Sequence, residues 1–410
     1  MLAAKFEAVH LPITQMLPEF LFNIGRILAE VAGAFNEVTH HFSPCPLTLP
    51  SPAGRGTVTS QGFWAEAWHR FRRKKLAMAA LTFIGGLVLT ALFAPAIAGT
   101  KPVLCRYKGT IYAPCLGYFD RRLEPAIFTK DRFRGTYPRN LKEKDPESWA
   151  IWPLVFQDPY RSVRADEWPG EPANPARDEG RPSGRNLFGT DQAGVDVFAK
   201  MVHGTTIALL VGFVSMGIAG TIGIVVGAIG GYFGGWIDMV TSRVTEIVMC
   251  IPTLVLILAV IAVIEKPTIW HTMAIIGATG WTGIARLTRG EFLRLKGSEF
   301  VMAAKASGAG PVRIMLRHIL PNALAPVLVP ITFGIASAVL LESSLSFLGF
   351  GPPPPTASWG SVLNDARSNL AMWWLVAFPG IAIFLTVLAY NLIGEALQEA
   401  TDPRLREARK

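Results

Sequence analysis

The chain has 410 residues, of which half are apolar and only 17% are charged, and its mean hydropathy is +0.35. A soluble enzyme would carry about 25% charged residues, so the composition excludes an ordinary soluble protein and indicates a polytopic membrane protein. The net charge of +9 does not indicate nucleic acid, because no RNA- or DNA-binding pattern accompanies it. In membrane proteins, basic residues anchor cytoplasmic segments and contact anionic lipid.

Residues 1–60 show no sustained hydrophobic periodicity, and their last third, HHFSPCPLTLPSPAGRGTVTS, is rich in proline and glycine. We interpret them as a flexible leader, or as residues upstream of the true start codon that the cell does not translate, in preference to a functional segment. An amphipathic helix at residues 16–35 fits either interpretation, but it is too polar to predict a span.

Residues 61–99 predict a cytoplasmic segment followed by the first transmembrane span, at about residues 76–98. A basic block directly precedes this span and comprises Arg70, Arg72, Arg73, Lys74 and Lys75. Positive residues beside a first span hold that end in the cytoplasm. A signal peptide shares this pattern, with APAIAG as its cleavage site, but the apolar run is long for that role. We therefore favour a retained anchor.

Residues 100–200 form a polar, proline-rich loop that the first span places outside the cytoplasm. The lysines and arginines of this loop do not oppose that placement, because loops longer than about 60 residues translocate largely regardless of charge. We predict that the loop folds over the outer mouth of the protein and contacts a delivery protein. Its small apolar core is predicted to consist of Trp149, Trp152, Phe156 and Tyr160.

Two of the four cysteines, Cys105 and Cys115, are close together in this external loop. An oxidising compartment permits a disulfide between them. Two cysteines ten residues apart fix no geometry, so two free thiols remain the alternative. Their spacing matches no zinc site, and we predict no metal ligands in this chain.

Five more spans are predicted, at about residues 205–229, 244–264, 268–288, 325–348 and 374–397, within a transmembrane domain of residues 201–400. Six spans return the tail, residues 401–410, to the cytoplasmic side. The sequence thus predicts an all-α, multi-pass protein of the cytoplasmic (inner) membrane. Both termini are inside, and one long extracytoplasmic insertion separates the first two spans.

The second span continues into a ladder of glycines at every fourth residue, Gly223, Gly227, Gly231 and Gly235. On a helix these glycines share one face, and small residues let helix backbones approach closely in lipid. Two interpretations are open: the face packs against a neighbouring helix, or it slides past one during transport. The GGYFGG sequence at the end of the ladder predicts a turn.

Few charges lie near the spans. Asp238, Arg243 and Glu246 lie near the start of span three, and Glu342 lies inside span five. An acid inside a span is a candidate functional residue, so we assign Glu342, Ser343 and Ser346 to a solute pathway. The alternative is that Glu342 bonds to Ser343, Ser344 or a neighbouring backbone group. Without a matching chain of acids, the sequence predicts no proton relay.

The segment at residues 291–323, between spans four and five, is too charged to cross a bilayer without a large cost. A short helix is predicted at residues 299–307. Gly308 suits the left-handed residue that ends a helix, and Pro311 suits the first turn of a second helix. In that helix we predict apolar contacts for Ile314, Leu316, Ile319 and Leu320, and a basic face of Arg313, Arg317 and His318. Pro321 marks the entry to span five. The segment lies flat on lipid or fills a groove in a partner protein.

Three motifs carry a resemblance to a known family. AAKASGAGPVRIMLRHILPNALAPVLV resembles the EAA loop of ABC importer permeases, with Ala303, Ala304, Gly308, Ile319 and Pro321 in its fixed positions and Met302 in place of the leading glutamate. FGTDQAGVDVFAKMVHGTTIALLVG is similar to a second motif, in which Val195 stands where arginine is common. ESSLSFLGFGPPPPTASWGSVL is the third. Outside the long loop, residues 61–410 resemble the C-type subunit of dipeptide and oligopeptide permeases, in the long-loop group that includes microcin-type peptide importers.

The resemblance implies a type I importer permease of six transmembrane helices that moves di- or oligopeptides, with nickel or another small solute as the alternative. The EAA loop, including Arg313 and Arg317, would couple the permease to one or two ABC ATPase subunits, which would hold ATP and Mg. The implied partners also include a second homologous permease and a periplasmic solute-binding protein. The chain has no Gly-x-x-x-x-Gly-Lys-Ser/Thr phosphate loop, so we expect no enzyme activity and no cofactor of its own.

Two other function classes are weighed against this one. An ion-driven secondary transporter would carry acids in paired, interrupted spans, and here such acids are sparse. A membrane-bound enzyme would need a catalytic external loop, but this loop has no histidine before His203 and no recognisable arrangement of nucleophile and base.

Overall fold

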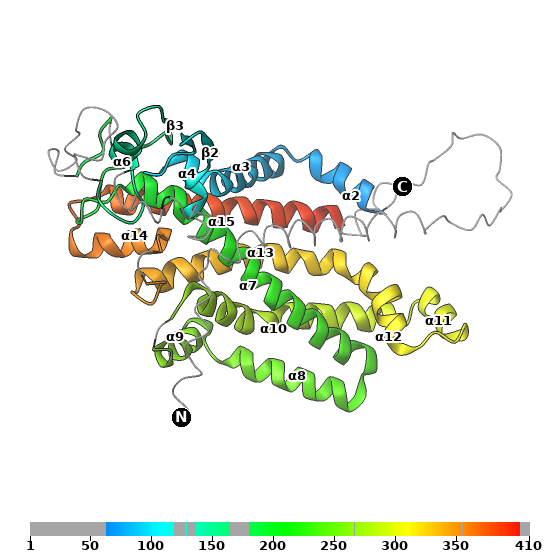
Figure 1. Ribbon diagram of the computed structural model, residues 1–410. Coiled ribbons are helices and arrows are strands. Elements are labelled where there is room, and N and C mark those ends of the chain that lie inside the picture. The colour runs from blue at the N-terminus through cyan, green and yellow to red at the C-terminus, as the bar shows by residue number, and fades with distance from the viewer. Residues whose placement is uncertain are drawn as a thin grey trace, which may run out of the picture.

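The computed structural model describes residues 63–118, 128, 137–163, 180–184, 186–265, 267–353 and 356–401. The predicted leader, residues 1–60, lies outside the described residues, as does the predicted tail apart from Thr401. In the described part, long helices run side by side in one bundle, with a small insertion of strands and short helices at one end (Figure 1).

The helices before the insertion are α2 (Phe63–Arg72), α3 (Lys75–Leu92) and α4 (Ala94–Ile97). After the insertion come α7 (Val197–Phe233), α8 (Gly235–Cys250), α9 (Thr253–Val263) and α10 (Ile269–Lys296). A loop of short helices leads to α13 (Leu320–Phe347), which is followed by α14 (Trp359–Asp365), η5 (Ala366–Ser368) and α15 (Trp374–Thr401).

Four helical runs in the described chain are long and apolar enough to cross a membrane: Lys75–Leu92, Val197–Phe233, Pro311–Phe347 and Trp374–Thr401. A fifth candidate is the pair α8 and α9, which is bent by 83°. The span predicted at residues 244–264 is therefore divided, because α8 ends and α9 begins inside it. Ile251 is extended at the break, because Pro252 removes a backbone donor and disfavours the helical conformation of the residue before it.

The glycine ladder packs α7 against α10. A methyl group built on Gly223 would lie 2.8 Å from the carbonyl oxygen of Trp281, and one on Gly231 would lie 2.7 Å from that of Arg289. Gly227 meets the carbonyl of Ala285 in the same way. These contacts match the packing interpretation, in which small residues let two backbones approach. The predicted turn begins later than GGYFGG suggests, because α7 continues to Phe233.

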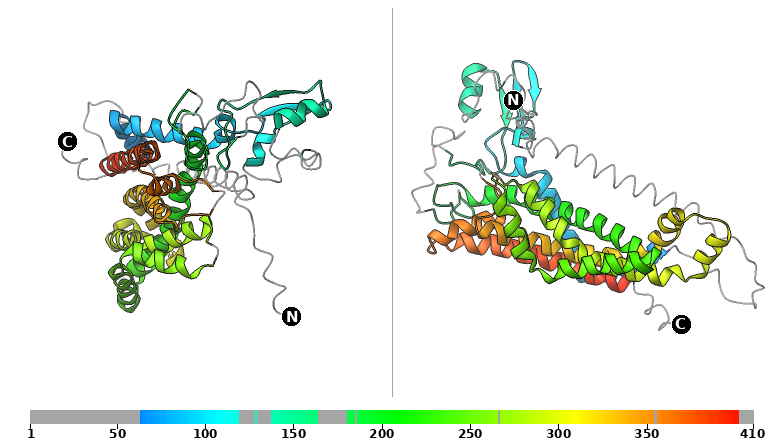
Figure 2. Two further views of the ribbon diagram at one scale, coloured as in Figure 1. Left: turned by 90° about the vertical axis from the view of Figure 1, so that its left-hand side faces the viewer. Right: turned by 90° about the horizontal axis from the view of Figure 1, so that it is seen from below.

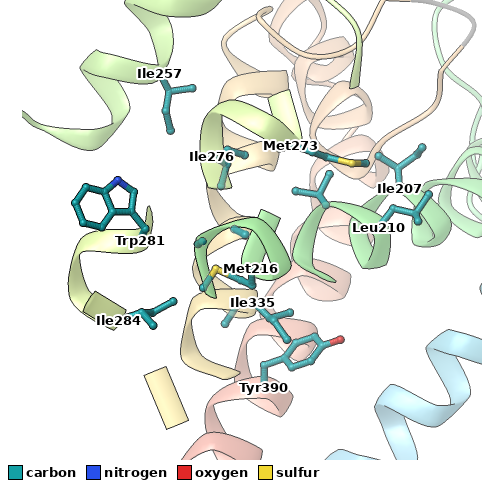
Figure 3. Close-up of a cluster of buried hydrophobic side chains, with 14 of the residues drawn as sticks. Ile207, Leu210, Met216, Ile257, Met273, Ile276, Trp281, Ile284, Ile335 and Tyr390 are labelled. Atoms are coloured by element: carbon teal, nitrogen blue, oxygen red, sulfur yellow. The ribbon is translucent and has the colours of Figure 1, made fainter. Parts of the chain in front are cut away.

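The core of the bundle lies around α7. Figure 3 shows Ile207, Leu210 and Met216 of α7 gathered with side chains from the other long helices. The further members that the figure labels are Ile257 of α9, Met273, Ile276, Trp281 and Ile284 of α10, Ile335 of α13 and Tyr390 of α15. Because α7 is central, both α10 and α13, the helices on either side of the charged loop, pack against it.

The insertion contains a three-stranded antiparallel sheet in the order β2-β1-β3. Its elements are β1 (Leu104–Tyr107), β2 (Thr110–Tyr112), η1 (Pro114–Tyr118), α6 (Tyr137–Lys144) and β3 (Trp149–Ile151). The buried core between sheet and helix consists of Cys105, Tyr107, Phe128, Tyr137 and Leu141. Seen along the bundle in the left view of Figure 2, the insertion extends to one side of the helices.

The predicted core of the insertion is partly wrong. Phe156 is buried and Trp152 packs beside the core, but Trp149 is 43% exposed and Tyr160 is 41% exposed. Successive residues of a strand point to opposite faces. On β3, Ala150 therefore faces the core and Trp149 faces away from it.

Cys105 and Cys115 are both buried and carry free thiols in this structure, and the choice between thiols and a disulfide stays a prediction. The Cys115 thiol donates a hydrogen bond to the carbonyl of Val103 at 3.5 Å. Burial raises the pKa of Cys105 to about 12, with a smaller contribution from the neighbouring Cys115.

Polar contacts join the insertion to the bundle. His203 of α7 bonds through Nε2 to the carbonyl of Ala98 at 2.8 Å, and its ring meets Tyr118 edge-on with 5.4 Å between ring centroids. Thr100 donates to Asp158 at 3.0 Å, and its hydroxyl also contacts that of Tyr118 at 2.9 Å. Since these groups are buried and bonded to one another, the base of the insertion is fixed to the start of α7.

Candidate functional site: the loop between α10 and α13

The loop between α10 and α13 lies at the opposite end of the bundle from the insertion (Figures 1 and 2). It comprises α11 (Glu299–Ala306), α12 (Pro311–Arg313) and the π-helical turn η4 (Ile314–Ile319), which continues into α13. The predicted pair of short helices joined by a glycine turn is therefore present. We call residues 297–319 the coupling loop, after the role that the sequence resemblance predicts for them.

Gly308 ends α11 in the left-handed conformation that the sequence predicts, with φ of +78°. The amide of Ala309 donates to the carbonyl of Ala304 at 3.1 Å, and the amide of Gly308 donates to that of Lys305 at 3.0 Å. This pair of bonds defines a Schellman motif, in which a left-handed residue satisfies the last carbonyls of a helix. No other atom lies within 4 Å of a methyl group built on Gly308, so the demand for glycine is conformational.

Pro311 occupies the first turn of α12, as predicted, because its missing amide would have no partner there. Pro321 marks the entry to span five, as predicted, because it lies at the start of α13, directly after the π turn. The amide of Leu320 donates to the carbonyl of Met315, five residues back, which lets the helix absorb a proline without breaking.

The inner side of the coupling loop packs on the ends of α7 and α10. Its buried members are Val301, Ile314 and Ile319, and they meet Tyr232 of α7 and Phe292 of α10. The ammonium groups of Lys296 and Lys305 lie over the Tyr232 ring, at 5.7 and 6.0 Å from its centroid. The loop is therefore held by the bundle and does not form a separate unit.

The outer side of the coupling loop is both apolar and basic. Its exposed apolar residues are Phe300, Met302, Val312 and Leu316. Lys305, Arg313 and Arg317 are exposed beside them, and His318 is half-buried. The predicted apolar contact of Leu316 is wrong: this side chain is 60% exposed, whereas Ile314 and Ile319 are buried against the bundle and Leu320 packs beside them. The loop therefore carries both exposed apolar side chains and exposed cations.

The two predicted alanines of the loop, Ala303 and Ala304, both lie on α11. Ala303 is exposed, and its carbonyl accepts a hydrogen bond from the amide of Ser307 at 3.0 Å. Ala304 is half-buried against the core of the loop, beside Ala309. The small side chain of Ala304 lets α11 lie close to this core. Within the described ranges, no group of three His, Cys, Asp or Glu side chains could hold a metal ion.

Glu342, Ser343 and Ser346 lie at the contact between α13 and α14, and all three are buried. The Ser346 hydroxyl donates to Oε1 of Glu342 at 2.6 Å, and the Ser358 hydroxyl contacts that of Ser346 at 3.3 Å. A methyl group built on Gly360 would lie 2.5 Å from the carbonyl of Ser343. The alternative for Glu342 named Ser343, Ser344 or a backbone group as its partner, whereas the partner here is Ser346. The solute-pathway role of these residues stays a prediction.

Comparison with known proteins gives two family matches. Residues 223–407 match the family described as binding-protein-dependent transport system inner membrane component. Residues 62–113 match the N-terminal TM domain of oligopeptide transport permease C. The second match contains α2, α3 and the first strands of the insertion, and the first contains the coupling loop.

Three curated relatives share long stretches with the chain. A dipeptide transport system permease protein from Alkalihalophilus pseudofirmus is 31% identical over 370 residues, which cover 90% of this chain and 99% of the relative. A peptidoglycan transport system permease protein from Agrobacterium fabrum is 31% identical over 383 residues, or 87% of this chain and 99% of the relative. A putative peptide permease protein from Brucella suis is 42% identical over 226 residues, or 54% of this chain and 74% of the relative.

The chain therefore belongs to the inner membrane components of binding-protein-dependent transport systems, the permeases of ABC importers. It is a multi-pass membrane protein, and members of this family are permeases, not ATPases. Within the coupling loop, sequence reasoning found the turn, the buried isoleucines and the basic residues. It missed the exposed apolar residues Phe300 and Val312. A local sequence pattern does not distinguish them from buried apolar residues, because their exposure depends on which face of the helix the bundle covers.

Proposed function

We propose that this chain is one permease subunit of an ATP-driven peptide importer and that the coupling loop docks on an ABC ATPase. The observation that carries the proposal is the outer side of the coupling loop. It is apolar and basic, and it is fixed to the bundle at the end opposite the insertion. The names of the relatives, which include dipeptide, peptide and peptidoglycan transport permeases, support peptides as the solute class.

The proposed topology has six crossings, with the coupling loop in the cytoplasm and the insertion outside. The pair α8 and α9 is one broken crossing, and α10 is another despite its lower hydropathy. Glycines and threonines lower the hydropathy of α10, and the same small residues let it pack along α7. The basic residues at the start of α3 lie at the same end of the bundle as the coupling loop, which agrees with the positive-inside rule.

Coupling follows from the continuity of the chain between loop and span. Pro311–Phe347 is one helical run of 37 residues that starts in the loop and crosses the membrane. A movement of the ATPase would displace the outer side of the coupling loop and would therefore move α13 directly. The Schellman turn at Gly308 fixes α11 against this run, so that both short helices move together.

The assembly would contain further subunits. A second homologous permease would complete the transmembrane path, and one or two ATPase subunits would bind ATP and Mg. A solute-binding protein would deliver the peptide at the insertion. The solute is a di- or oligopeptide in this proposal, with nickel or another small solute as the alternative.

Purification of the chain from its native membrane, followed by mass spectrometry of the co-purifying proteins, tests the assembly. We expect a second permease and at least one ATP-binding subunit. The purified complex should hydrolyse ATP and accumulate radiolabelled peptides in proteoliposomes only when the solute-binding protein and ATP are both present. Peptide accumulation driven by an ion gradient without ATP would contradict the proposal.

A further inference from the structure

A pocket of about 200 Å³ lies between α7, α8 and α10, away from the coupling loop and from the Glu342 cluster. Gly227 forms part of its wall on α7. Its polar lining comes from Thr241, Ser242, Thr245 and Glu246 on α8 and from Arg286 and Arg289 on α10. The pocket has room for a side-chain-sized group, and its polar wall would be costly to leave in contact with lipid.

The charged side chains around this pocket differ in whether they have a partner of opposite charge. Arg289 donates to Oδ2 of Asp238 at 2.7 Å, so its charge is neutralised within the chain. Glu246 accepts from Arg243 at 2.6 Å. Arg286 makes no ion pair with any described residue, and its hydrogen bond goes to the sulfur of Met249 at 2.9 Å. One guanidinium therefore lines the pocket without a carboxylate partner.

The depth of Arg286 makes this arrangement informative. It lies ten residues before Lys296, the end of α10 that leads to the coupling loop. At 1.5 Å per residue, this distance is about 15 Å along the helix. Charged side chains at such a depth in a span face a water-filled cavity or a partner and mark solute or ion pathways. Its place in the lining of the pocket gives Arg286 such a cavity.

The two threonine hydroxyls of the pocket cannot supply its donors. Thr241 donates to the carbonyl of Ile237 at 3.0 Å, and Thr245 donates to that of Thr241 at 2.7 Å. Both hydroxyls therefore present lone pairs to the pocket, and the guanidinium groups supply the donors. A carboxylate suits the Arg286 fork, which binds it through two parallel hydrogen bonds. The N–H groups of a peptide suit the threonine oxygens.

We propose that this pocket binds the C-terminal carboxylate of a peptide during its passage through the permease, with Arg286 as the residue that contacts it. The inference rests on the proposed function and adds to it a specificity-determining contact on the coupling-loop side of the membrane. Arg286 is exposed on the isolated chain, so the contact is weak enough to release the peptide. An acid of the second permease or a lipid phosphate would be the competing partner of Arg286.

A comparison of the uptake of a peptide with that of its C-terminal amide shows whether Arg286 binds the peptide carboxylate or one of the competing partners. The assembled complex in proteoliposomes is given trialanine or trialanine amide, each with saturating binding protein and with affinity for that protein measured separately. We expect Arg286→Gln to slow trialanine uptake about tenfold and to leave amide uptake unchanged, with Arg286→Lys in between. Arg294→Gln is the control, because Arg294 lies on α10 and pairs with Glu291, outside the pocket. An equal loss for acid and amide would overturn the inference.

A labelling experiment tests the pocket without transport. Ser242→Cys is introduced together with Cys250→Ser, because Cys250 is exposed on the same helix, and maleimide modification at position 242 is followed by mass spectrometry. We expect millimolar trialanine, but not its amide, to slow labelling at least threefold, and Arg286→Gln to remove this protection.

Three results would overturn the inference: no labelling, protection that persists in Arg286→Gln, or protection by phosphatidylglycerol in place of peptide. Failure of the proposed function gives a different result. The complex would then lack binding-protein-stimulated ATP hydrolysis, while the labelling experiment would still report on the carboxylate site.

Discussion

The coupling loop and the insertion lie at opposite ends of the bundle and differ in where their cores come from. The coupling loop packs Val301, Ile314 and Ile319 against Tyr232 and Phe292, which belong to the long helices. The insertion has a core of its own, built around β1 and α6. A segment that shares its core with the bundle transmits motion to it, whereas a segment with a separate core can unfold or rearrange alone.

The largest expected effect separates these two kinds of core. Tyr107 is fully buried in the insertion, and its ring lies 5.5 Å from that of Phe128. Tyr107→Ala should destabilise the insertion by about 3–5 kcal/mol, because it removes a buried aromatic ring. Limited proteolysis should then cleave the insertion while the bundle stays resistant. Ile111→Ala is the control, since Ile111 is 63% exposed on β2, and equal protease sensitivity in the two variants would refute the separate core.

The second prediction concerns Gly308. Gly308→Val should cost about 1–3 kcal/mol of backbone strain, because valine resists a positive φ. The spans should still insert, since no apolar run changes, but uptake should fall about tenfold or more as the docked state becomes less populated. Gly310→Ala is the matched control, because Gly310 has an ordinary φ of −69° and open space around it. Normal uptake by Gly308→Val would remove the coupling role from this loop.

A smaller effect is expected on the outer side of the loop. Leu316→Ala should leave the free energy of unfolding within about 0.5 kcal/mol of the original, because the side chain is exposed. It should weaken the binding free energy of the ATPase by about 1–2 kcal/mol, as for an apolar contact at an interface. Less ATPase should therefore co-purify with the chain. Leu340→Ala, at a 50% exposed position further along α13, should change neither the free energy of unfolding nor the binding of the ATPase. Equal ATPase recovery in both variants would argue against an interface at Leu316.

The smallest effect on uptake is expected at the cysteines of the insertion. With a pKa of about 12, the Cys105 thiol is almost wholly protonated at pH 8. Because the thiolate is the nucleophile, Cys105 should react about a thousandfold more slowly than a thiol of pKa 8.5. Cys105→Ala should not alter uptake. A Cys105–Cys115 disulfide in protein from the native membrane would contradict this prediction and support the bonded alternative.

Local sequence rules predicted the coupling loop well. Gly308 and Pro311 each occupy the backbone position that their own chemistry demands, and such demands do not depend on the rest of the fold. The glycine ladder was informative for a related reason, because close backbone approach in lipid has few other solutions. Its packing partner, α10, was not predictable from the ladder itself.

The errors concern which face of an element the fold covers. Trp149 and Leu316 are apolar residues that the sequence suggests are buried, and both are exposed because the covering element lies on the opposite face. The break between α8 and α9 had a signal in Pro252, but proline is also tolerated inside spans, as at Pro326 and Pro330 of α13. Tertiary context decides between these outcomes, and it cannot be read from a local pattern.

The most direct test of the account is to locate the ATPase on the chain. A photoactivated crosslinking residue is placed at Val312 on the coupling loop, or at Ile111 on the insertion, in cells that express the whole transporter. Both side chains are more than 60% exposed, at 66% and 63%. We predict that the residue at Val312 crosslinks to an ATP-binding subunit and that the residue at Ile111 never does. An ATPase crosslink from Ile111, or its absence from Val312 in an assembled and active complex, would contradict the account.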